Sequence, residues 1–95
     1  MELKHKDNGE KGAFLIRDEG HRAAEMTYVW MNDDVFIIDH TEVALRYEGQ
    51  GLGKQLVAGA VEFARERGIK ILPLCPFARA VFDKTPDYND VRFTR

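Results

Sequence analysis

The residue types in this sequence that best suit covalent chemistry are a single cysteine and a histidine that follows an apolar run. Cys75 stands in "ILPLCPF", directly before a proline that can open a helix. A helix N-terminus favours the thiolate form of a cysteine, and a thiolate can attack an acyl carbon. His40 stands in "IDHTEV", where an imidazole can accept a proton from a thiol or from an incoming amine. Both residues also suit purely structural roles, as a small buried side chain and a hydrogen-bonded core histidine.

A second candidate for chemistry is the run of alternating glycines in "YEGQGLGKQ", directly before a helical pattern. Glycines in this position let consecutive backbone N–H groups point into one concavity, and the helix start adds a partial positive charge. The pattern therefore predicts a site for phosphate or pyrophosphate. A P-loop is excluded because Gln55 stands where it needs serine or threonine, and the dinucleotide fingerprint is excluded because its third glycine is missing. The residues predicted to form the anion site are Gly49, Gln50, Gly51, Leu52, Gly53 and Lys54.

Hydrophobic periodicity predicts the elements that position these residues. In order, they are strands over 13–18, 23–32 and 35–43, a helix over 51–67, a strand over 69–75, and a second helix that Pro76 opens and Pro86 terminates. Short connections imply that the first three strands form an antiparallel meander, and the long helix implies a parallel crossover to the fourth. The predicted fold is α+β, in the order β-β-β-α-β-α, with a mixed, mostly antiparallel sheet.

The parallel strands 35–43 and 69–75 are expected to lie side by side, which would let His40 and Cys75 approach one another. Strict alternation along the strand places His40 on the same face as Phe36 and Ile38. A histidine on that face would be directed towards the core of the domain.

Length and composition limit the classes of function. The 95 residues form one domain, 1–95, with a net charge of −2 and no broad basic surface, which argues against nucleic acid as a partner. No apolar run approaches the ~20 residues of a membrane span, and one cysteine allows no internal disulfide, so we expect a soluble, cytoplasmic protein. The three histidines are scattered, and one cysteine cannot supply a tetrahedral site, so no metal site is predicted.

The stretch "EVALRYEGQGLGKQLVAGAVEFARERG" resembles the acyl-coenzyme A signature of the GNAT acetyltransferase superfamily, Arg/Gln-x-x-Gly-x-Gly/Ala at a helix N-terminus. Two registers of this signature match the sequence: one begins at Arg46, and the other starts the helix at Gly51. The second register is preferred. It puts Glu48 where the superfamily has arginine or glutamine. Together with "IDHTEV" and "IKILPLCPFARAVFDKTPDY", nearly the whole chain resembles a small, single-domain GNAT-like family whose members have a cysteine after the fourth strand.

This resemblance implies an acetyl-coenzyme A-dependent N-acyltransferase with an unidentified amine as acceptor. It implies that the glycine loop binds the coenzyme A pyrophosphate, that the strand backbone at Thr41 and Val43 aligns the pantetheine arm, and that the parallel strand pair splays apart to admit that arm. Transfer would proceed by direct attack of the amine or through an acyl group on Cys75, with His40 as a candidate base. The alternative function is a coenzyme A-binding or sensing module without turnover. Oligomeric state stays open.

Overall fold

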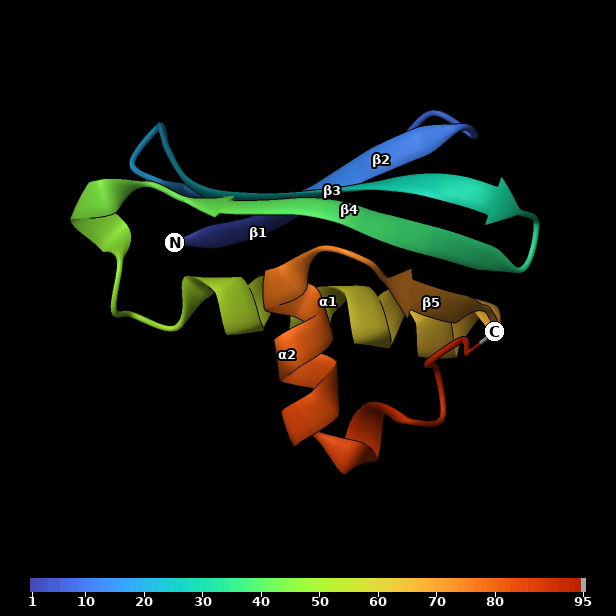
Figure 1. Ribbon diagram of the computed structural model, residues 1–95. Helices are drawn as coiled ribbons and strands as arrows, with labels where there is room; N and C mark the ends of the chain where they lie inside the picture. The colour runs from blue at the N-terminus through green and yellow to red at the C-terminus, as the bar shows by residue number, and fades with distance from the viewer. Residues whose placement is uncertain (95) are drawn as a thin grey trace.

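The computed structural model describes residues 1–94, which form a five-stranded sheet with both helices on one of its faces (Figure 1). The strands lie across the sheet in the order of the sequence. The elements are β1 (Glu2–Asp7), β2 (Lys11–Asp18), β3 (His21–Asn32), β4 (Val35–Val43), the 3-10 helix η1 (Leu45–Tyr47), α1 (Leu52–Arg67), β5 (Lys70–Pro73), α2 (Pro76–Lys84) and the 3-10 helix η2 (Pro86–Tyr88).

Strands β1 to β4 form an antiparallel meander, and α1 carries the chain to β5, which pairs with β4 in parallel. The predicted α+β class, the mixed sheet and the parallel pair are therefore confirmed. β5 is shorter than the predicted strand 69–75, because its ladder ends at Pro73. The sheet also has one strand more than the sequence pattern predicts, at its N-terminal edge.

This additional strand, β1, has no hydrophobic signature because all six of its residues are exposed. Long-range polar contacts attach it to the sheet. The carboxylate of Asp7 accepts hydrogen bonds from the Tyr28 hydroxyl at 2.5 Å and from Trp30 Nε1 at 2.8 Å. The ring of His5 stacks on Phe14 with 4.1 Å between centroids. The two contacts of Asp7 join residues 21 and 23 positions apart, so local periodicity does not reveal them.

The core lies between the inner face of the sheet and the apolar face of α1. Helical spacing puts the apolar residues of α1 on one stripe, which faces the sheet and is buried. Fully burying one such side chain stabilises the fold by roughly 1.5–3 kcal/mol. The helix is thereby held against the middle of the sheet, mainly beneath β2 and β3. The main contacts come from Met26, Tyr28, Phe36 and Ile38 of the sheet and Leu56, Val57, Ala60 and Val61 of α1.

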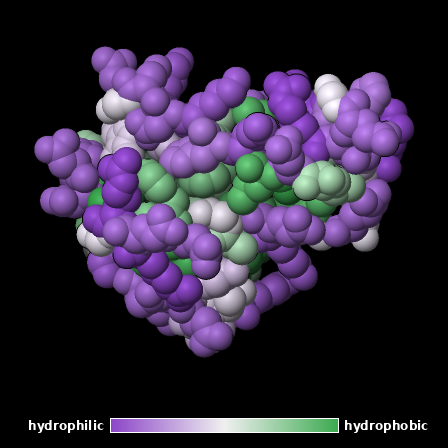
Figure 2. Space-filling model, turned by 180° about the vertical axis from the view of Figure 1, so that it is seen from behind, coloured by the Kyte–Doolittle hydropathy of each residue, from purple (hydrophilic) through white to green (hydrophobic). Residues whose placement is uncertain are grey.

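The surface seen from behind is mainly hydrophilic, with a band of hydrophobic residues across it (Figure 2). Three of the exposed large hydrophobic residues are close in sequence to the ends of β4 and β5: Leu45, Leu74 and Phe77. None of the helices formed by residues 1–94 has the length and apolar character of a membrane span.

Candidate functional site

The parallel pair β4–β5 separates halfway along β4. The ladder joins 35–38 to 70–73 and stops at Ile38, whose carbonyl oxygen accepts from the N–H groups of Leu74 at 3.1 Å and Cys75 at 3.0 Å. The next residue, Asp39, has no partner in β3 and forms a β-bulge. A bulge bends and twists its strand, and beyond it β4 continues for four residues without a partner on the β5 side. The predicted parallel pair is thus open at one end.

The open edge of β4 carries unpaired backbone N–H groups. The N–H of Ala44 donates to Ala23 at 2.9 Å, which identifies that pair as a hydrogen-bonded pair of the β3–β4 ladder. Because such pairs alternate along antiparallel strands, His40 and Glu42 also pair with β3 through their backbones, whereas the N–H groups of Thr41 and Val43 point the other way. Two donors therefore face the opening between β4 and β5.

The bulge also corrects the predicted orientation of His40. Strict alternation puts His40 on the face of Phe36 and Ile38, but the extra residue reverses the phase, so Thr41 turns to the helix side and His40 to the bare side. His40 is exposed and lies 3.5 Å from Glu42, between Nε2 and Oε2. The polar residues at 40 and 42 are the sequence signal for this reversal, since strict alternation from Phe36 would require apolar residues there.

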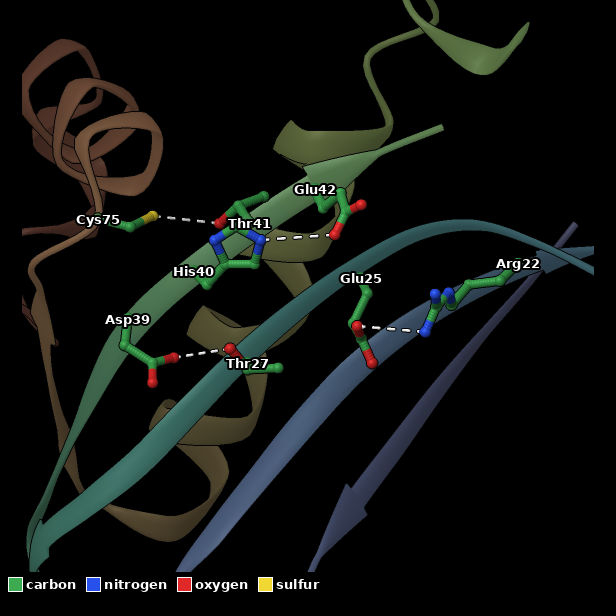
Figure 3. A network of polar contacts seen from close by, with 8 residues as sticks. All are labelled: Arg22, Glu25, Thr27, Asp39, His40, Thr41, Glu42 and Cys75. Carbon is green, nitrogen blue, oxygen red and sulfur yellow. Dashed lines mark hydrogen bonds and ion pairs between the residues drawn. The ribbon is translucent and has the colours of Figure 1, made fainter. Parts of the chain in front are cut away.

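Cys75 lies on the helix side of the opening, beside Thr41. Its Sγ is 3.2 Å from the Thr41 hydroxyl oxygen and accepts a hydrogen bond from the Ala78 N–H at 3.3 Å. The second contact makes Cys75 the N-cap of α2, and the side chain is buried, with 6% exposure. Figure 3 marks two separate contacts: a dashed line joins Cys75 to Thr41, and another joins His40 to Glu42. The partner of the thiol is therefore the threonine, and the sequence alone does not reveal this contact.

The glycine loop forms the N-terminus of α1. Gly51 is the N-cap, with a left-handed φ of 76°, and Gln55 is the first helical residue whose N–H reaches back to the cap carbonyl, at 3.1 Å. No side chain of residues 1–94 caps this end, and no acidic residue lies in the first turn. The first-turn N–H groups, from Leu52 to Lys54, are thus free for an anion, as the preferred register predicts. Glu48 is exposed and precedes the cap by three residues.

The third glycine of the loop has a packing role. Gly53 is buried, and a Cβ at this position would lie 2.5 Å from Cζ of Phe77 in the first turn of α2. The absence of a side chain lets the two helix N-termini approach one another. Beside them, a depression of about 400 Å³ between α1 and α2 has lysines and aromatic rings in its walls. These wall residues are Lys54, Phe77, Lys84 and Tyr88.

The opening, the helix N-terminus and the depression together suit a long anionic ligand that ends in a reactive carbonyl. Backbone N–H groups at the start of α1 suit phosphate oxygens, and the N–H groups at 41 and 43 suit a carbonyl oxygen beside a thiol. Within residues 1–94, no three His, Cys, Asp or Glu side chains are grouped so that they could hold a metal ion.

Comparison with known proteins agrees with this arrangement. Residues 13–91 match the sequence profile of the GCN5-related N-acetyltransferase family. A GCN5-like protein of Staphylococcus aureus is 38% identical, with a TM-score of 0.73 over 98% of this chain and 90% of that one. Protein NATD1 of Gallus gallus is 28% identical over 74 residues, which is 77% of this chain and 67% of that protein.

A more distant structure shares the fold. The ribosomal-protein-S18-alanine N-acetyltransferase of Escherichia coli is 19% identical, with a TM-score of 0.69 over 82% of this chain and 53% of that one. The profile match covers most of the chain, from β2 to the end of η2 and slightly beyond. The chain therefore belongs to the GCN5-related N-acetyltransferase family, a family of acetyltransferases that use acetyl-coenzyme A.

Proposed function

We propose that this protein transfers the acetyl group of acetyl-coenzyme A to a primary amine at the opening between β4 and β5. The observation that carries the proposal is the free edge of β4, where the N–H groups of Thr41 and Val43 face the same opening as the thiol of Cys75. The uncapped N-terminus of α1 supplies the anchor for the donor.

The pyrophosphate of the donor binds at the first turn of α1. Charge-assisted hydrogen bonds contribute roughly 1.5–3 kcal/mol each, so three or four N–H donors support a dissociation constant in the micromolar range. Lys54 adds a positive charge in the same turn, and Glu48 lies outside that turn. The depression between α1 and α2 accommodates the nucleotide end, with Lys84 and Tyr88 in its wall.

The thioester lies along the open edge of β4, where the N–H groups of Thr41 and Val43 donate to its carbonyl oxygen. The Cys75 thiolate attacks the carbonyl carbon, a sulfur–carbon bond forms, and the bond to the coenzyme A sulfur breaks. The departing coenzyme A thiolate takes up a proton from the solvent, which balances the proton that Cys75 released to the solvent when its thiolate formed. Backbone donors at the oxygen that gains negative charge lower the barrier to this step.

The amine approaches from the bare face of the sheet, on the opposite side of β4 from Cys75. His40 lies on that face, held by its contact with Glu42, and accepts the proton that the amine loses as it attacks the acetyl group. The Cys75 thiolate then departs. In this arrangement His40 serves the amine and not the thiol, because β4 separates its side chain from that of Thr41, the partner of Cys75.

Titration calorimetry with acetyl-coenzyme A and with coenzyme A tests donor binding, and release of free thiol in the presence of amines tests transfer. We expect binding of both ligands and release of thiol that depends on the amine. Absence of heat at millimolar acetyl-coenzyme A would overturn the proposal. Binding without transfer to any amine would instead identify a coenzyme A-binding module.

Mass spectrometry after mixing with acetyl-coenzyme A tests the role of Cys75. We expect an acetyl adduct on the wild-type protein that is absent from Cys75→Ala. Efficient amine acetylation by Cys75→Ala, with no adduct on the wild type in a single turnover, would show direct attack by the amine.

A further inference from the structure

The bare face of the sheet is polarised across its width. Cross-strand pairing places Lys6, Ala13, Thr27 and His40 in one row from β1 to β4. The neighbouring row runs from Lys4 on β1 to Glu42 on β4, and the unpaired Asp39 precedes His40 on β4. Lysines therefore lie on the β1 side of this face, and acidic side chains lie beside the opening at β4.

A cavity of about 580 Å³ crosses this face from the β4 bulge to β1. Asp39, which forms the bulge, lines one end, and Lys6 and Lys11 line the other. Between these two ends, the residues that line the floor of the cavity have small or apolar side chains. The floor residues that matter to the ligand are Ala13, Thr27 and Val29. A volume in this range holds a small molecule, and no helix covers the face (Figure 1).

The charged groups at the two ends are available to a ligand. Oδ1 of Asp39 accepts the Thr27 hydroxyl at 2.7 Å, which turns the carboxylate over the bare face towards β3 (Figure 3). Within the described residues, Asp39, Lys6 and Lys11 take part in no ion pair. Asp7 also lines the cavity, but its carboxylate already accepts from Tyr28, Trp30 and the backbone of Gly9.

We infer that this cavity binds the acetyl acceptor, and that the acceptor is a primary amine with an anionic group, a carboxylate or a phosphate, at its far end. Asp39 attracts the ammonium group next to the opening, and Lys6 with Lys11 attracts the anion. The inference rests on the proposed function, because it assigns the acceptor of that same transfer.

Strand spacing sets the length of the ligand. Lys6 and His40 are three inter-strand steps apart, about 14 Å between Cα atoms, and Lys11 on β2 is one step closer to β4. A glycine-sized amino acid is too short to reach both ends. A longer ω-amino acid or an extended peptide of a few residues matches this distance.

The acceptor class is tested with acetyl-coenzyme A and a series of ω-amino carboxylates of increasing length, each compared with the n-alkylamine and the diamine of equal length. We expect kcat/KM, measured by thiol release, to rise with length among the amino carboxylates and to exceed that of the matched alkylamine by about tenfold, since two exposed charge contacts contribute about threefold each. The diamine should be the poorest of the three.

Charge reversal gives the sharper result. In Lys6→Glu/Lys11→Glu the order should invert, with the diamine preferred over the amino carboxylate, while the affinity for acetyl-coenzyme A in calorimetry stays unchanged. Lys4→Glu is the matched control, because Lys4 lies on the same strand but outside the cavity and pairs with Glu2. This control should keep the wild-type preference.

The outcomes separate the two proposals. Transfer to alkylamines with no preference for the anionic group, or the same preference in the charge-reversed variant, would overturn the acceptor assignment and leave the acetyltransferase intact. Failure to acetylate any amine in the series would overturn both. If Lys4→Glu lost the preference for amino carboxylates to the same extent as Lys6→Glu/Lys11→Glu, the overall charge, and not this cavity, would select the acceptor.

Discussion

Asp39 determines which side of β4 each functional side chain occupies. As an unpaired residue in the β3–β4 ladder, it turns Thr41 towards Cys75 and His40 towards the bare face. Cys75, His40 and Thr41 are candidates from the sequence, but strict alternation predicted the wrong face for His40, because the bulge shifts the phase of the strand by one residue. The contact between Cys75 and Thr41 depends on the same bulge, so it could not be predicted from the sequence either.

The His40→Gln variant tests the assignment of the base. Glutamine keeps the size and polarity of the side chain but cannot accept the proton, so we expect kcat with amines near neutral pH to fall by about 100-fold. The loss should diminish at high pH, where more of the amine is already unprotonated. Steady-state kinetics as a function of pH, with the KM for acetyl-coenzyme A as the control, provide the measurement. An unchanged pH profile would exclude a proton-transfer role.

At the scale of elements, the N-termini of α1 and α2 lie on either side of the proposed donor site. Their periodic apolar faces and their glycine and proline boundaries made both helices predictable from the sequence. Their mutual approach was not predictable, because it depends on Phe77 packing over Gly53. Spacing predicts an anion-binding loop, but only the fold shows that its third glycine is a contact between helices.

The Gly53→Ala variant tests this contact. The added Cβ would lie 2.5 Å from Cζ of Phe77, so the Phe77 ring must turn away or α2 must shift from the start of α1. Overpacking of this kind costs roughly 1–3 kcal/mol, and we expect a lower melting temperature together with weaker binding of acetyl-coenzyme A. In the Phe77→Ala background, Gly53→Ala should cost much less stability than it costs in the wild-type protein. Additive effects of the two substitutions would contradict the proposed contact.

At the scale of the whole molecule, two titratable side chains of the first strand make the stability of the fold depend on pH. Burial lowers the pKa of His5, against the opposing influence of Asp7. Partial burial acts to raise the pKa of Asp7, but hydrogen bonds from Tyr28, Gly9 and Trp30 outweigh it and lower that pKa. In both cases the unfolded chain binds protons more readily than the folded one. The stability that both groups contribute is therefore lost as the pH falls.

Urea unfolding between pH 7 and pH 5 measures this effect. The contribution of His5 is present above its unfolded pKa of about 6.5 and decreases as the pH falls below that value, so the wild-type midpoint should decrease towards pH 5. The contribution of Asp7 is lost only at lower pH. In His5→Gln the decrease between pH 7 and pH 5 should be smaller. If the urea midpoint of His5→Gln decreased with pH as steeply as that of the wild type, other groups would control the pH dependence of stability.

The class of the fold, the family and the enzyme class were predictable from the sequence and are confirmed by the sheet topology and the family match. α1 and the glycine loop are local features, so pattern and spacing identified them. β1 was missed because its six residues are exposed and carry no hydrophobic pattern, although it pairs with β2 along its whole length. The site residues themselves stay predictions, since acetyl transfer by this chain depends on contacts with a donor and an acceptor.

Backbone amide NMR during titration with acetyl-coenzyme A tests the central claim most directly, because the proposed donor site consists mainly of N–H groups. We predict the largest shift changes at the amides of Gly51 to Lys54 and at Thr41 and Val43, with little change at the amides of β1. Shifts confined to other parts of the molecule, or no shifts at saturating acetyl-coenzyme A, would contradict the account.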